Sequence, residues 1–239
     1  MNLYIVYGSE SILLNEFYKK INGIVIRIYN NKIPDSKENF FDIKIDNNIE
    51  IEFKKIFEKI KKKITKITFL GVGFVADSNL FFSLKDEEIK KLLEANILNY
   101  IKLTSLILPL MMSLRGGKFI YLSSFRSQIP TRGTALYSSS KSFGETFFKT
   151  IGLEYGRFNI TSHIVRMGYF DGRLLDNLSE QKKKEIKKKI SLSRLGTAED
   201  LASTINMIEK LEYNNSGIIE ITGGLDFSWL IFQFLKLTI

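Results

Sequence analysis

The strongest constraint on the fold is a regular alternation of short apolar runs with longer amphipathic stretches along the chain. The apolar runs are rich in β-branched and aromatic residues, which is typical of buried strands. Because helices separate most of these runs, the sequence predicts right-handed βαβ units and a parallel sheet. The predicted strands are Leu3 to Tyr7, Ile24 to Ile28, Phe40 to Ile45, Ile67 to Leu70, Lys118 to Ser123, Ile160 to Arg166 and Gly217 to Thr222.

The amphipathic stretches repeat apolar residues at helical spacing. They predict helices at residues 11–21, 49–63, 86–113, 135–157, 173–190 and 198–211. The whole pattern indicates an α/β fold in three layers, a doubly wound parallel sheet of about seven strands known as the Rossmann fold, whose ligands bind at the carboxyl ends of the strands. No repeat, low-complexity linker or break in composition divides the chain, so we expect a single domain over residues 1–239.

Composition excludes several classes of protein. Without cysteine the chain has neither disulfides nor thiolate chemistry, and a reducing cytoplasm is the expected location. No stretch is apolar enough to predict a membrane span, and the chain runs into its first strand without a signal peptide. The net charge of +9 comes largely from lysines at helical spacing, which indicates solvated helix faces rather than nucleic-acid binding. We expect no metal site.

Four polar residues that can carry chemistry fall at one end of the predicted sheet. Ser124 follows the fifth strand directly, and Tyr137 and Lys141 lie in the first turns of the next helix. Because residues four apart share a helix face, the Tyr137 hydroxyl and the Lys141 ammonium can reach one bound molecule. Asn96 lies within the helix that precedes the fifth strand. These residues predict a catalytic site.

In these residues the chain resembles the short-chain dehydrogenase/reductase family over nearly its whole length. The likeness rests on Asn96 in Glu-Ala-Asn-Ile, the strand ending at Ser124, the Tyr137-x-x-x-Lys141 pair, and the later segments Arg-Leu-Gly-Thr-Ala-Glu-Asp and Glu-Ile-Thr-Gly-Gly. The separations between the first three positions match those of bacterial 3-oxoacyl-acyl-carrier-protein reductases. The resemblance implies an NAD(P)-dependent enzyme that interconverts a ketone and a secondary alcohol.

The chemistry explains these residue types. Carbonyl reduction needs a hydride for the carbon and a proton for the oxygen, so a neutral acid must lie beside that oxygen. Free tyrosine, with a pKa of about 10, is a poor donor near neutrality, and a nearby positive charge lowers that pKa. We expect Lys141 to supply this charge to Tyr137. The resemblance further implies that Lys141 binds the nicotinamide ribose, that Ser124 holds the substrate oxygen, and that Asn96 helps to hold a water linking Lys141 to solvent.

The loop after the first strand departs from the family pattern. A glycine-rich loop there lets the backbone approach the pyrophosphate at a helix N-terminus. This chain reads Tyr-Gly-Ser-Glu-Ser-Ile-Leu-Leu, in which Gly8 remains but Ile12 and Leu14 stand in place of glycines. Ser9 and Ser11 can donate hydrogen bonds, and related enoyl reductases also have a Ser-Ile pair in this loop. We therefore expect Gly8, Ser9, Ser11 and Ile12 to contact the cofactor.

Small residues near the site suggest further cofactor contacts. Gly71 and Gly73 replace the family's Asn-Asn-Ala-Gly after the fourth strand, and they still allow the backbone to pass close to a ribose. Gly168 remains where the family has Pro-Gly beside the nicotinamide. Asp42 resembles the family aspartate that contacts adenine. The resemblance therefore adds Gly71, Gly73, Gly168 and Asp42 to the predicted cofactor site.

The end of the second strand bears on the choice of dinucleotide. An acidic residue there would bind the ribose 2′-hydroxyl of NAD and repel the 2′-phosphate of NADP. The chain has Asn30, Asn31 and Lys32 instead, which can accept a phosphate. NADP is therefore the favoured cofactor, and NAD remains possible.

The variable parts of the chain say less about the substrate. Residues 169–190 are expected to form a lid over the active site, and the apolar tail 225–239 to pack on a partner subunit in a homodimer or homotetramer. We expect a small carbonyl substrate, either an acyl-carrier thioester or a sugar or polyketide-like metabolite. Because the glycine loop is altered, a second hypothesis stays open: a non-catalytic family member that has lost cofactor binding and acts as a subunit or binding module.

Overall fold

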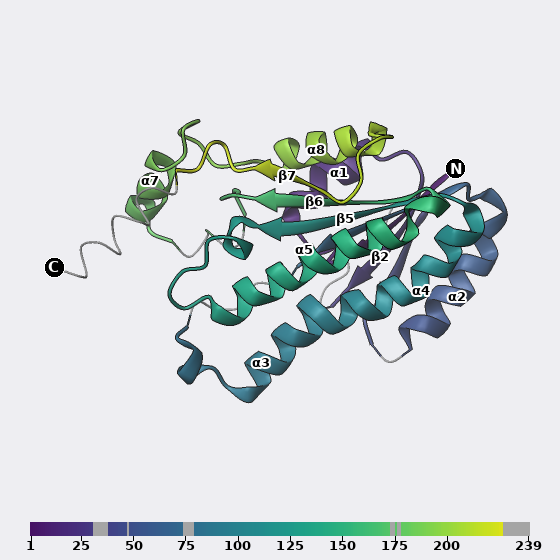
Figure 1. Cartoon of the computed structure of the whole chain (residues 1–239), viewed down its shortest axis with the longest axis horizontal. Helices are drawn as coiled ribbons and strands as arrows, with labels where there is room; N and C mark the ends of the chain where they lie inside the picture. The colour runs from purple at the N-terminus through teal and green to yellow at the C-terminus, as the bar shows by residue number, and fades with distance from the viewer. Residues whose placement is uncertain (31–37, 47, 74–78, 173–174, 176–177, 227–239) are drawn as a thin grey trace.

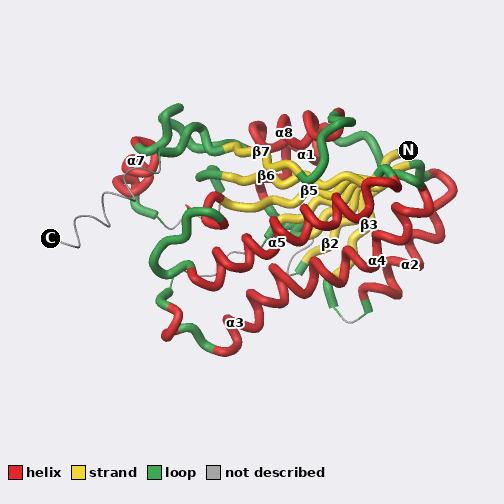
Figure 2. Tube along the Cα trace, in the orientation of Figure 1, coloured by secondary structure: helices red, strands yellow, loops and turns green. Residues whose placement is uncertain are grey.

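The computed structural model describes residues 1–30, 38–46, 48–73, 79–172, 175 and 178–226. Its centre is a parallel seven-stranded sheet in the order β3-β2-β1-β4-β5-β6-β7 (Figures 1 and 2). All seven predicted strands are present, and the doubly wound α/β fold is confirmed. The strands are β1 (Asn2–Tyr7), β2 (Ile24–Tyr29), β3 (Phe40–Lys44), β4 (Lys66–Val72), β5 (Gly117–Ser124), β6 (Ile160–Met167) and β7 (Gly217–Ile221).

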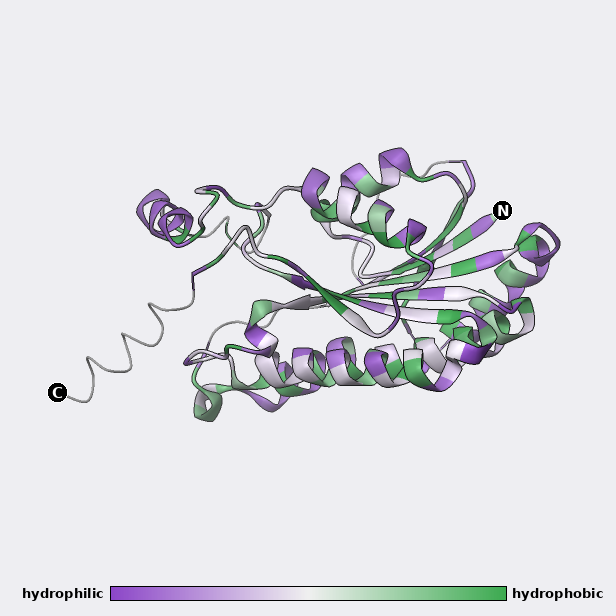
Figure 3. Ribbon diagram, turned by 45° about the horizontal axis from the view of Figure 1, so that its top comes forward, coloured by the Kyte–Doolittle hydropathy of each residue, from purple (hydrophilic) through white to green (hydrophobic). Residues whose placement is uncertain are grey.

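Helices cover both faces of the sheet, as Figure 3 shows. Within the described residues they are α1 (Asn15–Lys20), α2 (Ile49–Ile60), α3 (Asp86–Leu93), α4 (Asn99–Leu114), α5 (Ala135–Tyr155), α7 (Glu180–Lys188) and α8 (Ala198–Lys210). Phe53 of α2, Tyr100 of α4 and Phe148 of α5 are buried against one face of the sheet. Phe17 of α1 and Ile205 of α8 are buried against the other. Two separate apolar layers therefore hold the sheet, as expected for parallel strands.

Two predicted helices are shorter than the sequence suggested. The stretch 11–21 begins as a 3-10 turn at Ile12–Leu14 before the six residues of α1. The chain must re-enter the sheet almost at once, and Gly23 passes so close that a Cβ there would lie 2.6 Å from the Asn2 carbonyl oxygen. In the stretch 173–190 the helix α7 runs over Glu180–Lys188; residues 173–174 and 176–177, and residues 227–239 of the predicted tail, lie outside the described residues.

The helix predicted over 86–113 is present but interrupted. The π-helical segment Glu94–Leu98 joins α3 to α4, and the Tyr7 hydroxyl donates to the Ala95 carbonyl of this segment at 2.8 Å. The continuous helix Asp86–Leu114 meets the length and composition of a membrane span, which corrects the expectation that no stretch does. One face of this helix is buried against the sheet through Tyr100 and Leu103, and 33% of its most apolar stretch is buried, so the core accounts for part of its apolar character.

Helix α5 lies close to the sheet because Gly144 has no side chain. A Cβ at this position would overlap the ring of Tyr121 on β5. Phe148, one turn further along α5, stacks on the same ring with 5.1 Å between the ring centres. This contact sets the depth at which α5 lies, and with it the positions of the polar side chains in its first turns.

We predict that Gly144→Ala lowers the free energy of unfolding by about 1–3 kcal/mol, the usual cost of overpacking. The gain in helix propensity from glycine to alanine, about 1 kcal/mol, would offset only part of that cost. Urea denaturation measures the change. Thr146→Ala, at an exposed position of the same helix, is the control and should leave stability nearly unchanged. Equal stability of Gly144→Ala and the wild type would contradict the close packing of α5.

Candidate active site

The candidate active site lies at the carboxyl ends of the central strands, where the strand order reverses. β1 pairs with both β2 and β4, so the chain winds outward from it in two directions. Loops that leave neighbouring strands separate at such a reversal and leave a crevice between them. Ser124 ends β5, and Tyr137 and Lys141 lie in the first two turns of α5. These are the elements on which the sequence placed the three residues.

The Ser124 hydroxyl lies close enough to the Tyr137 hydroxyl to lower the pKa of that group. Burial raises the pKa of the Tyr137 hydroxyl, against the Ser124 hydroxyl and the positive charge of Arg126, which both lower it. The effect of burial is the largest of the three, so the pKa of Tyr137 lies above its usual value of 10.0. Tyr137 therefore carries its proton at neutral pH and presents an O–H donor next to the Ser124 hydroxyl.

Lys141 is buried beside this pair. Its Nζ donates to the Leu122 carbonyl oxygen at 2.9 Å and lies 5.8 Å from the centre of the Tyr137 ring. Burial lowers the pKa of Lys141 to about 7, and the nearby charge of Glu145 opposes this effect. The positive charge of Arg126 lowers the pKa of Tyr137, and the expected effect of Lys141 on that pKa stays a prediction.

Gly73 makes room for the Lys141 ammonium. A Cβ at Gly73 would overlap Lys141 Nζ and would lie 3.4 Å from Asn96 Oδ1. The sequence predicted this glycine as a place where the backbone approaches a cofactor ribose. In the structure its evident role is steric: it lets the Lys141 amine reach the end of β4.

Asn96 enters the site from the π-helical segment, a distortion that is frequent at functional sites. Its side chain is fully buried, and Nδ2 donates to Ser140 Oγ at 3.0 Å. Ser140 Oγ in turn donates to the Tyr137 carbonyl oxygen at 2.7 Å. This chain of hydrogen bonds fixes Asn96 to the turn of α5 between Tyr137 and Lys141. The structure thus brings all four predicted catalytic residues together.

The loop after β1 keeps part of the predicted phosphate site. Gly8 has a φ of +73°, and a Cβ there would overlap the Val72 carbonyl oxygen, so the position requires glycine. Ser9 is buried, and both its N–H and its hydroxyl donate to the Ile28 carbonyl oxygen. A phosphate contact by Ser9 would cost these bonds. The Ser11 hydroxyl makes no capping hydrogen bond, and Ile12 exposes its side chain.

The remaining glycines predicted to contact the cofactor have packing roles. A Cβ at Gly71 would overlap the ring of Tyr100. A Cβ at Gly168 would lie 2.9 Å from Thr222 Cα, and the Gly168 N–H donates to the Ile221 carbonyl oxygen at 3.1 Å. Both glycines allow main chain or an aromatic ring to pass close by, which explains their presence without a cofactor.

At the second strand, Asn30 is exposed directly after β2, whereas Asn31 and Lys32 lie outside the described residues. Asp42 does not stand at the end of a strand, as the proposed adenine contact required. It lies inside β3, and its two carboxylate oxygens accept from Nε of the buried Arg27 at 2.6 Å and from Nη2 at 2.9 Å. Because both oxygens are engaged by one guanidinium, the structure argues against Asp42 as an adenine ligand.

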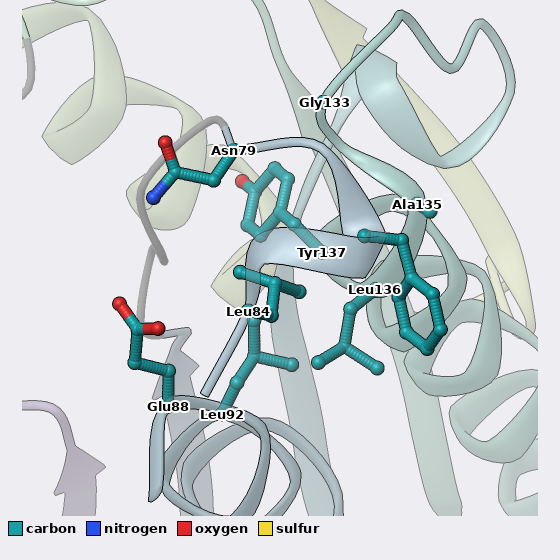
Figure 4. A pocket seen from close by; sticks show the side chains of 9 residues that line it. Asn79, Leu84, Glu88, Leu92, Gly133, Ala135, Leu136 and Tyr137 are labelled. Atoms are coloured by element: carbon teal, nitrogen blue, oxygen red, sulfur yellow. The ribbon is translucent and has the colours of Figure 1, made fainter. Parts of the chain in front are cut away.

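A small pocket opens beside Tyr137, between α3, the segment that precedes it and the start of α5. In Figure 4, Leu84, Leu92 and Leu136 lie beneath the Tyr137 ring, and Asn79 and Glu88 lie to one side. The pocket is therefore lined by apolar side chains and by Tyr137, whose hydroxyl can donate a proton. Sequence reasoning did not single out these residues, because they come together only when α3 packs on α5.

Sequence reasoning also missed an ion pair on the catalytic helix. Glu145, one turn after Lys141, accepts from Arg166 Nη2 at 2.8 Å and from the hydroxyls of Ser123 and Ser127. Both side chains of the ion pair are about 10% exposed. Arg166 stands on β6, two residues before Gly168, and an arginine in an otherwise apolar strand end was the signal that a buried acid must face it. The pair fixes β6 to α5.

We predict that Glu145→Gln costs about 2–3 kcal/mol of unfolding free energy at neutral pH, because it leaves the Arg166 charge only partly compensated. Burial alone would raise the pKa of Glu145, but hydrogen bonds from Arg166, Ser127 and Ser123 lower it overall. A lowered folded-state pKa stabilises the fold above the unfolded value, and this stability disappears as pH falls through the folded value.

The difference between wild type and Glu145→Gln should therefore shrink as pH is lowered below 4.5, the usual value for glutamate. Urea denaturation at pH 7, 5 and 3 measures it. The matched control is Glu220→Gln, which removes the half-exposed second carboxylate on Arg166 and should have a small effect. A Glu145→Gln deficit that does not depend on pH would rule out the ion pair as its cause.

Comparison with known proteins identifies the family. The family model described as short chain dehydrogenase matches residues 16–183 of the chain. The match covers well over half of the chain, and this protein therefore belongs to the short-chain dehydrogenase family and is an oxidoreductase.

Individual relatives support the same assignment. The chain is 28% identical over 186 residues to the 3-oxoacyl-acyl-carrier-protein reductase of Buchnera aphidicola, covering 77% of this chain and 75% of that protein. It is 26% identical over 186 residues to carbonyl reductase family member 4 of Xenopus laevis, with the same coverage of 77% and 75%. A short chain dehydrogenase family protein from Francisella tularensis has the same fold, with a TM-score of 0.79 at 21% identity over 94% of this chain and 98% of that one.

Proposed function

We propose that this protein interconverts a ketone and a secondary alcohol with NADP as its dinucleotide. The observation that carries the proposal is the placement of Ser124 at the carboxyl end of β5 and of Tyr137 at the start of α5, beside the buried Lys141. When bound, the dinucleotide supplies the hydride. The Tyr137 O–H donates the proton to the substrate oxygen, and the Ser124 hydroxyl holds that oxygen by a second hydrogen bond.

The residues at the inner end of the crevice suit a nicotinamide ribose. A lysine ammonium has three N–H donors. Among the described residues, Lys141 gives one of them to the Leu122 carbonyl oxygen and otherwise faces aromatic rings. A buried ammonium with unused donors is costly unless hydroxyl acceptors are supplied. Ribose hydroxyls would meet that need, and we infer that Gly8, the Ser11 hydroxyl and Asn30 hold the phosphates and the far ribose.

A second candidate function is a family member without cofactor, which acts as a subunit or binding module. The observation that favours it is the loop after β1, where Ile12 brings a side chain in place of a glycine and Ser9 gives both of its donors to Ile28. The two functions differ first in affinity for the dinucleotide, so the first test is a binding measurement rather than an assay of turnover.

We expect NADPH to bind with micromolar affinity and NADH more weakly, because Asn30 follows β2 without an acidic residue to repel the 2′-phosphate. Titration of each dinucleotide, followed by nicotinamide fluorescence and by calorimetry, measures both affinities. Lys141→Ala should weaken binding of both, since it removes the buried donors. If neither dinucleotide binds at millimolar concentration to the wild type, the reductase proposal fails and the cofactor-free function takes its place.

Tyr137→Phe should lower kcat about a hundredfold or more, the usual contribution of a positioned general acid, while the affinity for NADPH changes little. The phenylalanine keeps the ring and its packing but has no proton to give. Turnover of simple ketones by NADPH oxidation, together with the dissociation constant, measures both effects. Tyr213→Phe, at a fully exposed tyrosine, is the matched control. Retained activity in Tyr137→Phe would exclude this tyrosine as the proton donor.

The finer features of the proposal follow from family likeness. The substrate is a small carbonyl compound or an acyl-carrier thioester, the protein acts in the cytoplasm, and the subunits form a homodimer or homotetramer. These features rest on similarity to reductases of about one quarter identity. The pocket of Figure 4, with its leucine floor, supports a substrate that carries a small apolar substituent next to the carbonyl.

A further inference from the structure

Arg126 is a cation at the candidate active site that lacks an acidic partner within the described part of the chain. It lies two residues after Ser124, in the short turn Phe125–Ser127 that links β5 to the loop before α5. Other arginines, at positions 27, 166 and 194, each pair with a carboxylate. A partly buried arginine without such a partner costs free energy in the folded protein unless a ligand supplies the negative charge.

The guanidinium of Arg126 is held in place by neutral groups. It stacks on Phe125, with 4.8 Å from Cζ to the ring centre. Nη1 donates to Thr131 Oγ1, and Nη2 donates to the Tyr169 hydroxyl at 3.3 Å. Tyr169 follows β6, and its ring lies 5.2 Å from that of Phe125, so the turn after β5 and the segment after β6 together fix the orientation of Arg126. The guanidinium has five N–H donors in one plane, and these contacts leave some of them for a ligand.

Arg126 lies near the two side chains proposed to contact the substrate oxygen, Ser124 and Tyr137. Its backbone N–H donates to Ser124 Oγ at 3.3 Å. Its charge is also close enough to the Tyr137 hydroxyl to lower the pKa of that group. The side chain that would hold the substrate oxygen, the side chain that would protonate it and this guanidinium therefore all lie at the carboxyl end of β5.

We propose that Arg126 binds an anionic group of the substrate, a carboxylate or a phosphate, while the carbonyl of the same small molecule contacts Ser124 and Tyr137. Arginine suits this role because its planar fork donates two parallel hydrogen bonds to either anion. The inference rests on the proposed ketone reduction and narrows its substrate to anionic carbonyl compounds. It favours an oxo acid or a phosphorylated ketone over a neutral acyl-carrier thioester.

Matched substrate pairs that differ only in the charged group test the proposal. Acetoacetate is compared with methyl acetoacetate for the carboxylate, and dihydroxyacetone phosphate with dihydroxyacetone for the phosphate. A charge-assisted hydrogen bond changes affinity about tenfold to a hundredfold. We expect the wild type to prefer the anion of at least one pair by about that factor in kcat/KM, and Arg126→Gln to lose the preference, so that its ratio of kcat/KM for the charged member to kcat/KM for the neutral member falls toward one.

Two further variants show whether a change in Arg126→Gln comes from the lost anion contact or from a disturbed fold. Arg126→Lys keeps the charge but not the fork, and should retain part of the preference. Arg132→Gln removes an exposed arginine from the same loop and should leave the preference unchanged. Thermal unfolding of each variant shows whether it folds, and Arg126→Lys carries the test if Arg126→Gln does not. Equal kcat/KM for the charged and neutral members in the wild type would overturn the proposal.

A binding measurement separates this inference from the proposed function. Calorimetry compares 3-hydroxybutyrate with its methyl ester and glycerol 3-phosphate with glycerol, in the absence of turnover. Binding that is selective for the anion and is lost in Arg126→Gln supports the anion site even if no ketone is reduced, in which case only the proposed reaction fails. Turnover of neutral ketones without selective binding of either anion overturns the anion site and leaves the reductase proposal intact.

Discussion

The site depends on the burial of the Lys141 amine between the end of β4 and helix α5. A buried ammonium is costly, and here it is compensated by the Leu122 carbonyl oxygen, by two aromatic rings and by the charge of Glu145. Two glycines make this burial possible: Gly73 leaves space for the amine itself, and Gly144 lets α5 lie close to Tyr121. The positions of Tyr137, Ser140 and Asn96 all follow from this depth of the helix.

Charges near the proton donor come from parts of the chain that are distant in sequence. Glu145 on α5 pairs with Arg166 on β6, and Arg126 after β5 is held by Tyr169 after β6. The Arg166 guanidinium is thus neutralised by an acid of the protein, while the partners of the Arg126 guanidinium among the described residues are neutral. The first holds the scaffold together, and the second is suited to a ligand. The ion pair that stabilises the β5, β6 and α5 region and the arginine proposed to bind a ligand therefore lie in the same part of the fold.

The catalytic half of the crevice and the cofactor half differ in how closely they follow the family. Among the four predicted catalytic residues, Asn96 is tied to Tyr137 through Ser140, and Lys141 donates to the Leu122 carbonyl oxygen. The loop after β1 retains the left-handed Gly8 but turns Ser9 inward and presents Ile12 at the surface. Affinity for the dinucleotide is therefore the property on which the two candidate functions differ, and it depends on one short loop.

The sequence by itself determined the seven strands, their parallel arrangement and the elements on which the four predicted catalytic residues stand, because apolar periodicity and spacing along a helix are local properties. Only the tertiary structure decided that the charge of Arg126 acts on Tyr137, that Asp42 pairs with Arg27, and that Arg166 faces Glu145. It also decided that Gly71, Gly73 and Gly168 serve close packing. Such features depend on which side chains from distant elements come into contact and on how far each is buried from water. Local patterns of residues along the chain do not predict either of these.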